Sequence, residues 1–176
     1  MDLSGAMVGL AEAEEARRPL GLEYRVGDVR TLEVSAEFDL VFAAYLLNYA
    51  RTAGELTQMC RTVARALRPG GRFVTANSNP AEPTADPPAG RAYGFSRRVV
   101  GELVEGAPIV LEFFLPDGSF EVTSYYLSVE TMEEAFRAAG LREVRWHAPR
   151  VSPEGLREFG AQLQRLRIAV GELAPV

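Results

Sequence analysis

The chain has 176 residues, 47% of them hydrophobic and 24% charged, which is the size and composition of one ordinary globular domain. A formal net charge of −5 disfavours nucleic acid as the main partner, and no apolar run is long enough to span a membrane. One cysteine, one histidine and no lysine exclude an internal disulfide, a metal centre with several cysteines or histidines, and covalent catalysis by lysine. From these counts we expect no metal site. The N-terminus lacks the pattern of a signal peptide, so we expect a cytoplasmic protein.

The N-terminal part of the chain alternates between helical and strand-like patterns. Ser4 is a suitable N-cap for a helix that Pro19 and Gly21 end, and the alternation from Leu22 to Val26 predicts a strand. The nearly continuous apolar run from Phe38 to Ala44 is typical of a strand buried on both faces of a parallel sheet.

A second helix is predicted from Ala53 to Leu67, with Cys60 on its apolar stripe as a small core residue. The sequence Pro69-Gly70-Gly71 ends this helix, and Arg72 to Ala76 has the composition of another strand. The order helix, strand, strand, helix, strand favours an α/β fold with a parallel sheet.

The second half of the chain begins with a proline-rich loop or lid from Asn79 to Gly90. The apolar runs Pro108 to Leu115 and Ser119 to Leu127, joined by Pro116-Asp117-Gly118, predict an antiparallel hairpin. The last elements expected are a helix from Val129 to Ala139 capped by Gly140, a strand from Leu141 to His147 and a tail helix from Ser152 to Leu173. We therefore divide the chain into 1–78, the first α/β part, 79–127, the lid loop and hairpin, and 128–176, the C-terminal elements of the same domain.

Four patterns in the first 80 residues occur in a characteristic order and spacing: Asp2-Leu3-Ser4-Gly5-Ala6-Met7, Gly27-Asp28-Val29, Phe38-Asp39-Leu40-Val41 and Leu67-Arg68-Pro69-Gly70-Gly71-Arg72-Phe73. Together they resemble the class I S-adenosylmethionine-dependent methyltransferases. The resemblance implies a Rossmann-like sheet with helices on both faces and S-adenosyl-L-methionine as the cofactor. It also implies that 1–78 is a partial cofactor-binding half and that the lid and hairpin of 79–127 lie on the substrate side. More narrowly, the segments 43–50 and 146–149 are similar to small-molecule methyltransferases of the toxoflavin-biosynthesis type.

The resemblance also implies cofactor-binding positions. Asp2 matches the carboxylate that accepts hydrogen bonds from the two ribose hydroxyls, and Asp28 matches the one that accepts from the adenine amino group. The backbone N–H of Val29 would meet a ring nitrogen, and Ala44 would line the cofactor. Two alternatives stay open, because Asp2 also suits a helix start and Asp28 also suits a turn after a strand.

The glycine-rich loop that holds the methionine end of the cofactor in this family has no counterpart before Asp2. We therefore expect a sheet that lacks the family's first strand and helix, which lie in the middle of its strand order. Three arrangements remain open: the sequence is a fragment of a longer product, the family's third strand pairs directly with its fourth, or a second copy fills the gap.

The substrate-side candidates are polar or aromatic residues near predicted strand ends and in the lid: Tyr45, Asn48, Tyr49, Tyr93 and His147. Each also suits simple packing. The hairpin aromatics Phe113, Phe114, Phe120, Tyr125 and Tyr126 are expected to form cross-strand pairs, one face of which could line a pocket. The pair Arg97-Arg98 suits either a solvated surface or an acidic substrate.

The sequence thus predicts methyl transfer to an N, O or C atom of a small molecule, without nucleic-acid or membrane partners and with a homodimer as one assembly. The alternative is a methyltransferase-like remnant that binds no cofactor and acts as a binding or dimerisation module. Affinity for the nucleoside distinguishes the two.

Overall fold

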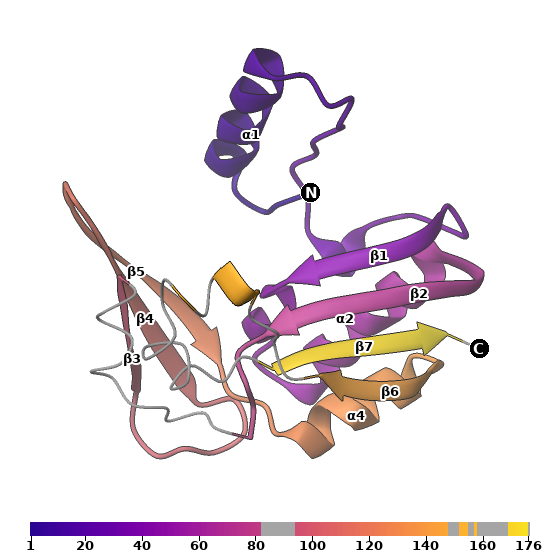
Figure 1. Cartoon of the computed structure of the whole chain (residues 1–176). Helices are drawn as coiled ribbons and strands as arrows, with labels where there is room; N and C mark the ends of the chain where they lie inside the picture. The colour runs from indigo at the N-terminus through magenta and orange to yellow at the C-terminus, as the bar shows by residue number, and fades with distance from the viewer. Residues whose placement is uncertain (82–93, 148–151, 155–156, 158–168, 176) are drawn as a thin grey trace.

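The structure, a computed structural model, describes residues 1–81, 94–147, 152–154, 157 and 169–175. Its larger sheet has the order β1-β2-β7-β6, formed by β1 (Phe38–Ala44), β2 (Leu67–Asn77), β7 (Ala169–Pro175) and β6 (Leu141–His147). β1 is parallel to β2, and β7 is antiparallel to both of its neighbours. The carboxyl ends of β1, β2 and β6 therefore lie at one edge of the sheet (Figure 1). The predicted α/β class is confirmed.

Two helices cover one face of this sheet, α2 (Ala53–Ala66) and α4 (Val129–Ala138). Their N-caps, Thr52 and Ser128, each accept a hydrogen bond from a backbone N–H of the first turn. Apolar side chains from both helices meet the sheet in one buried cluster whose largest members include Phe73, Phe136, Leu56 and Leu141. Both predicted helices are confirmed, and the buried, apolar side chains of this interface hold the domain together.

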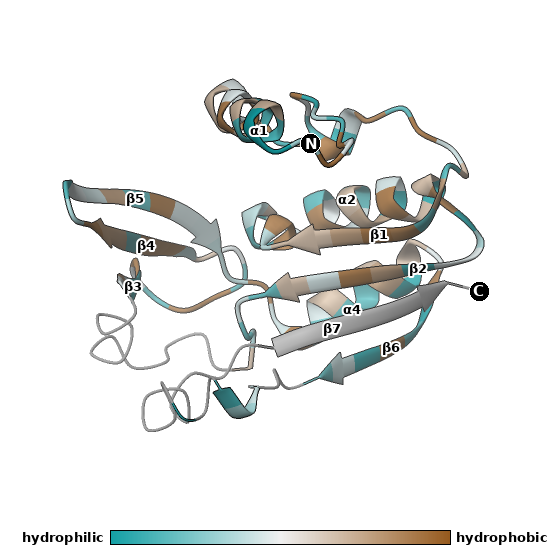
Figure 2. Cartoon of the chain, turned by 45° about the horizontal axis from the view of Figure 1, so that its top comes forward, coloured by the Kyte–Doolittle hydropathy of each residue, from teal (hydrophilic) through white to brown (hydrophobic). Residues whose placement is uncertain are grey.

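The smaller sheet has the order β3-β4-β5 and consists of β3 (Phe95–Val99), β4 (Pro108–Leu115) and β5 (Gly118–Tyr125). The predicted hairpin is confirmed, with Leu115 opposite Gly118. Phe113 stacks on Phe120 across it, with ring centroids 5.2 Å apart, which confirms one of the expected aromatic pairs. β3 was not predicted, because its five residues include two adjacent arginines that interrupt an apolar pattern. Figure 2 shows hydrophobic residues concentrated in β2 and β4 and hydrophilic ones along β6.

The prediction that Phe38 to Ala44 is buried on both faces is wrong. β1 is the edge strand of the larger sheet, and its inner side chains Val41 and Ala43 pack against the core cluster. The opposite side chains are exposed, Leu40 by 56% and Phe42 by 62%. Among the described residues the sheet therefore has helices α2 and α4 on one face, instead of helices on both faces. A continuous apolar run predicts a strand, but it does not determine whether helices cover both faces of that strand.

The N-terminal helix α1 (Gly5–Arg17) is confirmed, with the Ser4 hydroxyl accepting from the Met7 N–H. It stands apart from the sheet in Figure 1. The strand predicted from Leu22 to Val26 is wrong, because only Val26 pairs, in a single parallel bridge with Asp2. The segments that correspond to the family's third and fourth strands are Leu22 to Val26 and β1. They do not pair with each other in the described residues, because β1 is an edge strand whose neighbour is β2, so the arrangement with direct pairing is contradicted there.

Two further boundaries differ from the prediction. Helix α2 ends at Ala66, and β2 already begins at Leu67, so that the Pro-Gly-Gly sequence forms an irregularity inside the strand. Its register shifts there from Phe38 opposite Leu67 to Leu40 opposite Arg72. The tail is helical at 153–154 and 157, but residues 169–175 form strand β7 where a helix to Leu173 was predicted. The rest of that tail and most of the predicted lid lie outside the described residues.

Candidate functional site

The carboxyl end of β1 turns sharply into a short 3-10 helix, η2 (Leu46–Tyr49). Tyr45 makes this turn with a left-handed backbone, φ +56°, and its N–H donates to the Ala76 carbonyl at 2.6 Å. A non-glycine residue in this conformation is uncommon and is often associated with function. The turn directs η2 away from the strand and toward the three-stranded sheet, where it contacts β5.

A cleft lies between η2, the end of β2 and the three-stranded sheet, and we call it the inter-sheet cleft. About 410 Å³ of space free of protein atoms lies in and in front of it, most of it open to solvent, and the enclosed part is small. Its lining is Leu47, Asn48, Leu56, Ser78, Asn79, Pro80, Arg97, Ile109, Ser124, Tyr125, Tyr126, Leu127 and Met132. The cleft is narrow as it stands, so a metabolite-sized ligand has to displace side chains at its mouth. A mainly apolar wall with a few polar groups is typical of a small-molecule site.

The substrate-side candidates fall in different places. Asn48 lines the inter-sheet cleft, where its amide donates to the Ser78 hydroxyl at 3.3 Å. Tyr45 and Tyr49 lie on the same turn, each nearly half exposed, and do not line the cleft. His147 is exposed at the carboxyl end of β6, with β7 between it and β2. Tyr93 lies outside the described residues.

The predicted ribose residue, Asp2, is brought beside the segment that carries Asp28. The Asp2 N–H donates to the Arg25 carbonyl at 3.1 Å, and the Asp2 carbonyl accepts from Gly27 at 2.9 Å. Burial raises the pKa of Tyr49, and the negative charge of Asp2 raises it further, which places this carboxylate within electrostatic range of the phenol. One carboxylate oxygen of Asp2 also accepts from the Ser4 N–H at 2.7 Å, as expected of a residue at a helix start.

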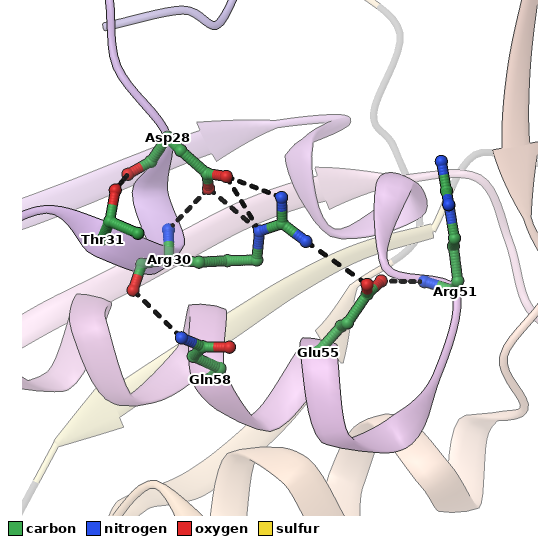
Figure 3. A network of polar contacts seen from close by, with 6 residues as sticks. All are labelled: Asp28, Arg30, Thr31, Arg51, Glu55 and Gln58. Atoms are coloured by element: carbon green, nitrogen blue, oxygen red, sulfur yellow. Dashed lines mark hydrogen bonds and ion pairs between the residues drawn. The ribbon is translucent and has the colours of Figure 1, made fainter.

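Asp28 is the centre of a polar network that connects η1 (Val29–Thr31) with helix α2 (Figure 3). Its carboxylate accepts from the Arg30 backbone N–H at 2.8 Å and forms an ion pair with the Arg30 guanidinium at 2.6 Å. These hydrogen bonds and the positive charge lower the pKa of Asp28. Arg30 also pairs with Glu55 at 3.3 Å, and Glu55 accepts from the Arg51 N–H at 2.8 Å.

The alternative that Asp28 is a turn residue after a strand is confirmed, because its carboxylate caps η1 and pairs with Arg30. A carboxylate has about four acceptor positions, so an adenine amino group would share Asp28 with Arg30. Val29 is buried, and Ala44 lies exposed at the end of β1. The nucleoside roles of Asp2, Asp28, Val29 and Ala44 therefore stay predictions.

Several residues of the cleft were missed or undervalued from the sequence. Ser78 and Asn79 come just after the predicted strand Arg72 to Ala76, separated from it by Asn77, and polar residues at that position are a usable signal for the carboxyl edge of a parallel sheet. Arg97 was one half of an arginine pair, and only the alternation of β3 separates it from Arg98. Within the described residues no group of three or more His, Cys, Asp or Glu side chains could hold a metal ion. No described helix is long and apolar enough to cross a membrane.

Comparison with known proteins gives a family and a fold. Residues 1–71 match the family described as a methyltransferase domain, and no curated protein matches the chain. A S-adenosylmethionine-dependent methyltransferase from Clostridium acetobutylicum is similar over 99% of this chain and 72% of its own, at 15% identity and a TM-score of 0.69. The PH0226 protein from Pyrococcus horikoshii is similar over 99% of this chain and 71% of its own, at 20% identity and a TM-score of 0.66.

A third similar structure has S-adenosylmethionine bound. It is CalS10, an amino pentose methyltransferase from Micromonospora echinaspora, similar over 97% of this chain and 71% of its own, at 21% identity and a TM-score of 0.54. These structures share the fold, and none of the comparisons tests the narrower resemblance to the toxoflavin type. The match of residues 1–71 to a methyltransferase domain and the shared fold support the resemblance to the class I methyltransferases, and the S-adenosylmethionine-dependent neighbours support S-adenosyl-L-methionine as the cofactor.

Proposed function

We propose that this chain transfers a methyl group from S-adenosyl-L-methionine to a small-molecule acceptor in the inter-sheet cleft. The observation that carries the proposal is the position of η2. Its residue Tyr49 lies within electrostatic range of Asp2, one of the predicted nucleoside residues, and its residue Asn48 lines the cleft. One turn at the end of β1 thus separates a candidate nucleoside site from a candidate acceptor site. Ligands bind at this edge in open α/β sheets.

S-adenosyl-L-methionine, when bound, would supply a methyl group on a positively charged sulfur: an electron pair of the acceptor would bond to the methyl carbon, and the sulfur would leave with the electrons of the broken carbon–sulfur bond. The contribution of the protein is then mainly to position the two molecules. Asp2 would hold the ribose hydroxyls and Asp28 the adenine amino group, while the cleft orients the acceptor and excludes water. Asp2 is exposed, and Asp28 lies in the network of η1, which Arg30 anchors to Glu55 of helix α2.

The proposal is tested by titrating S-adenosylhomocysteine, the product form of the cofactor, into the whole chain by calorimetry. We expect micromolar binding that weakens at least tenfold in Asp28→Ala. The control is Asp39→Ala, which also removes a carboxylate paired with an arginine, here Arg68 at 2.8 Å, at the opposite end of β1. That variant should bind as well as the unmodified chain. A folded chain without affinity for the nucleoside would contradict the proposal.

A second candidate function has its own support. The exposed apolar side chains of α1 and β1, which include Met7, Leu10, Leu40 and Phe42, suit a binding or dimerisation module. Its expected signature is a dimer in sedimentation experiments without affinity for the nucleoside. A monomer that binds S-adenosylhomocysteine would exclude this candidate.

A further inference from the structure

The carboxylate of Asp28, the predicted partner of the adenine amino group, is already fully engaged by Arg30 (Figure 3). Its Oδ1 atom accepts from the Arg30 backbone N–H at 2.8 Å and from the guanidinium Nε at 3.1 Å. Its Oδ2 atom accepts from Nε at 3.0 Å and from Nη2 at 2.6 Å. Since a carboxylate offers about four acceptor positions, two on each oxygen, an adenine amino group has to replace one of these donors.

These hydrogen bonds differ in how easily they can be broken. The backbone N–H of Arg30 is fixed by η1, where Asp28 is the N-cap, and it leaves only if this turn unfolds. The guanidinium stands at the end of a flexible side chain that is 35% exposed, so water can solvate it as it moves. A ligand would therefore replace the hydrogen bonds from the guanidinium, and the cap of η1 would stay.

A second anion is in place to hold the guanidinium. Its Nη1 atom lies 3.3 Å from Oε1 of Glu55, in the first turn of helix α2. The other carboxylate oxygen of Glu55 accepts from the Arg51 N–H at 2.8 Å, which fixes Glu55 in this position. Arg30 therefore lies between two carboxylates, closer to Asp28 than to Glu55, and it can leave the first without losing its charge partner.

We propose that Arg30 is a displaceable cap on Asp28, which the adenine amino group replaces while the guanidinium remains with Glu55. This inference rests on the proposed function and concerns how its nucleoside site opens. The exchange leaves each charged group with a partner: Asp28 keeps the backbone N–H and gains the amino N–H, and Arg30 keeps Glu55. Because the cap has to be broken first, the site binds adenine more weakly than an uncapped carboxylate would.

The opposite role for Arg30 is to orient Asp28 for the nucleoside, and the two roles predict opposite signs. If the guanidinium competes with adenine, its removal strengthens the binding of a ligand that carries the amino group. If it only orients the carboxylate, its removal weakens that binding. The occupied acceptor positions of Asp28 favour competition.

The test compares two neutral nucleosides, adenosine and purine riboside, which differ only in the amino group of the base. Each is titrated into the whole chain and into Arg30→Met, which removes the guanidinium donors, and binding is followed by ligand-observed NMR. We expect Arg30→Met to bind adenosine about tenfold more tightly than the unmodified chain does, as one hydrogen bond to a charged group would give. Purine riboside should bind equally well to both, because it has no amino group to replace the cap.

Two further variants serve as controls. Arg68→Met removes the arginine of another ion pair, with Asp39 at 2.8 Å at the opposite end of β1, and should change neither affinity. Glu55→Gln removes the second anion and keeps an acceptor for the Arg51 N–H. It should weaken adenosine binding in the unmodified chain and leave it unchanged in Arg30→Met.

Three results would overturn the inference: equal or weaker binding of adenosine by Arg30→Met, an equal gain for purine riboside, or the same effect of Glu55→Gln with and without Arg30. Arg30→Met should also unfold at a lower urea concentration than the unmodified chain, because the ion pair is lost. Stability and affinity then change in opposite directions, which a loss of structure alone does not produce. Circular dichroism confirms that each variant is folded.

Failure of this inference is distinguishable from failure of the proposed function. A chain that binds S-adenosylhomocysteine, with no gain for adenosine in Arg30→Met, retains the methyltransferase proposal and loses the cap. No affinity for any of the three nucleosides in either chain overturns both. Binding of adenosine by Arg30→Met alone supports the cap and contradicts methyl transfer by the unmodified chain.

Discussion

Helices α1 and α2 are of nearly equal length and begin with the same kind of cap, yet they contribute differently to the molecule. In α2 six residues are buried, and in α1 only Val8 is. The hydroxyls of Ser4 and Thr52 each accept a backbone N–H in the first turn. Local signals are thus sufficient to define where a helix forms, while its contribution to stability depends on a partner surface. Four predictions follow this difference from large effects to small.

The largest expected difference is in thiol reactivity. Cys60 of α2 is fully buried, and burial raises its pKa to about 12. Relative to the ordinary value of 9.0, this lowers the thiolate fraction at pH 8 roughly a thousandfold. Met7 of α1 is 55% exposed, so a cysteine placed there in the double variant Cys60→Ala, Met7→Cys should react at the rate of a free thiol. Reaction with a chromogenic disulfide measures both rates, and comparable rates would contradict the burial of Cys60.

The same contrast appears in stability when one leucine is truncated in each helix. Leu56 of α2 is 0% exposed, and Leu56→Ala should lower the free energy of unfolding by about 2–5 kcal/mol. Leu10 of α1 is 66% exposed, and Leu10→Ala should change it by less than about 0.5 kcal/mol. Urea unfolding followed by Trp146 fluorescence measures both, because this indole donates to Glu133 at 2.9 Å and reports on the packing of α4 against β6. A large effect at Leu10 would show that α1 packs against a partner in solution.

The capping residues provide a smaller and more local comparison. Thr52→Ala should lower the free energy of unfolding by about 1 kcal/mol, since α2 unfolds only with the domain. Ser4→Ala should lower the helix content seen by circular dichroism and leave the urea midpoint unchanged, because α1 can unfold by itself. Equal shifts of the two midpoints would mean that α1 and α2 unfold as one cooperative unit.

These helices also show how far sequence patterns extend. Caps, helical spacing and the Pro116-Asp117-Gly118 turn involve neighbours in the chain, and the helices and the hairpin that they predict are confirmed. β7 was missed because its partners are distant: Leu173 pairs with Phe73, a hundred residues earlier. Local periodicity has no access to such a pairing, so the tail was assigned to a helix.

The same limit applies to the candidate site. The positions at strand ends could be predicted because each follows its own strand, and Asn48 was found in this way. The placement of Arg97 and Arg98 on opposite faces of the sheet depends on the register of β3 with β4, and the ion pair of Asp28 depends on the fold of η1, which brings Arg30 back to it. Contacts between elements, and the choice of face that they impose, come only from the folded chain.

The smallest expected effect concerns the ion pair between Asp28 and Arg30. This pair lies in the segment between α1 and α2 and is linked to α2 through Glu55. Because the pKa of Asp28 is lowered in the folded chain, the pair stabilises the fold above the unfolded pKa of about 4, and this contribution disappears as the pH falls through the folded value. Arg30→Gln should therefore lower the urea midpoint by a constant amount between pH 5 and 8. Below about pH 4 the difference from the unmodified chain should shrink.

Asp28→Asn separates this electrostatic effect from loss of the cap, because an asparagine still accepts the Arg30 N–H. In that background the pH-dependent effect of Arg30→Gln between pH 2.5 and 6 should shrink to the part that comes from the pair of Arg30 with Glu55. The network also links Arg30 to Glu55 of α2, so hydrogen exchange at residues 28–31 should accelerate in Arg30→Gln while exchange in α1 stays the same. If α1 also exchanged faster, residues 28–31 and helix α1 would unfold as one cooperative unit, held to the packed core through the ion pair of Arg30 with Glu55.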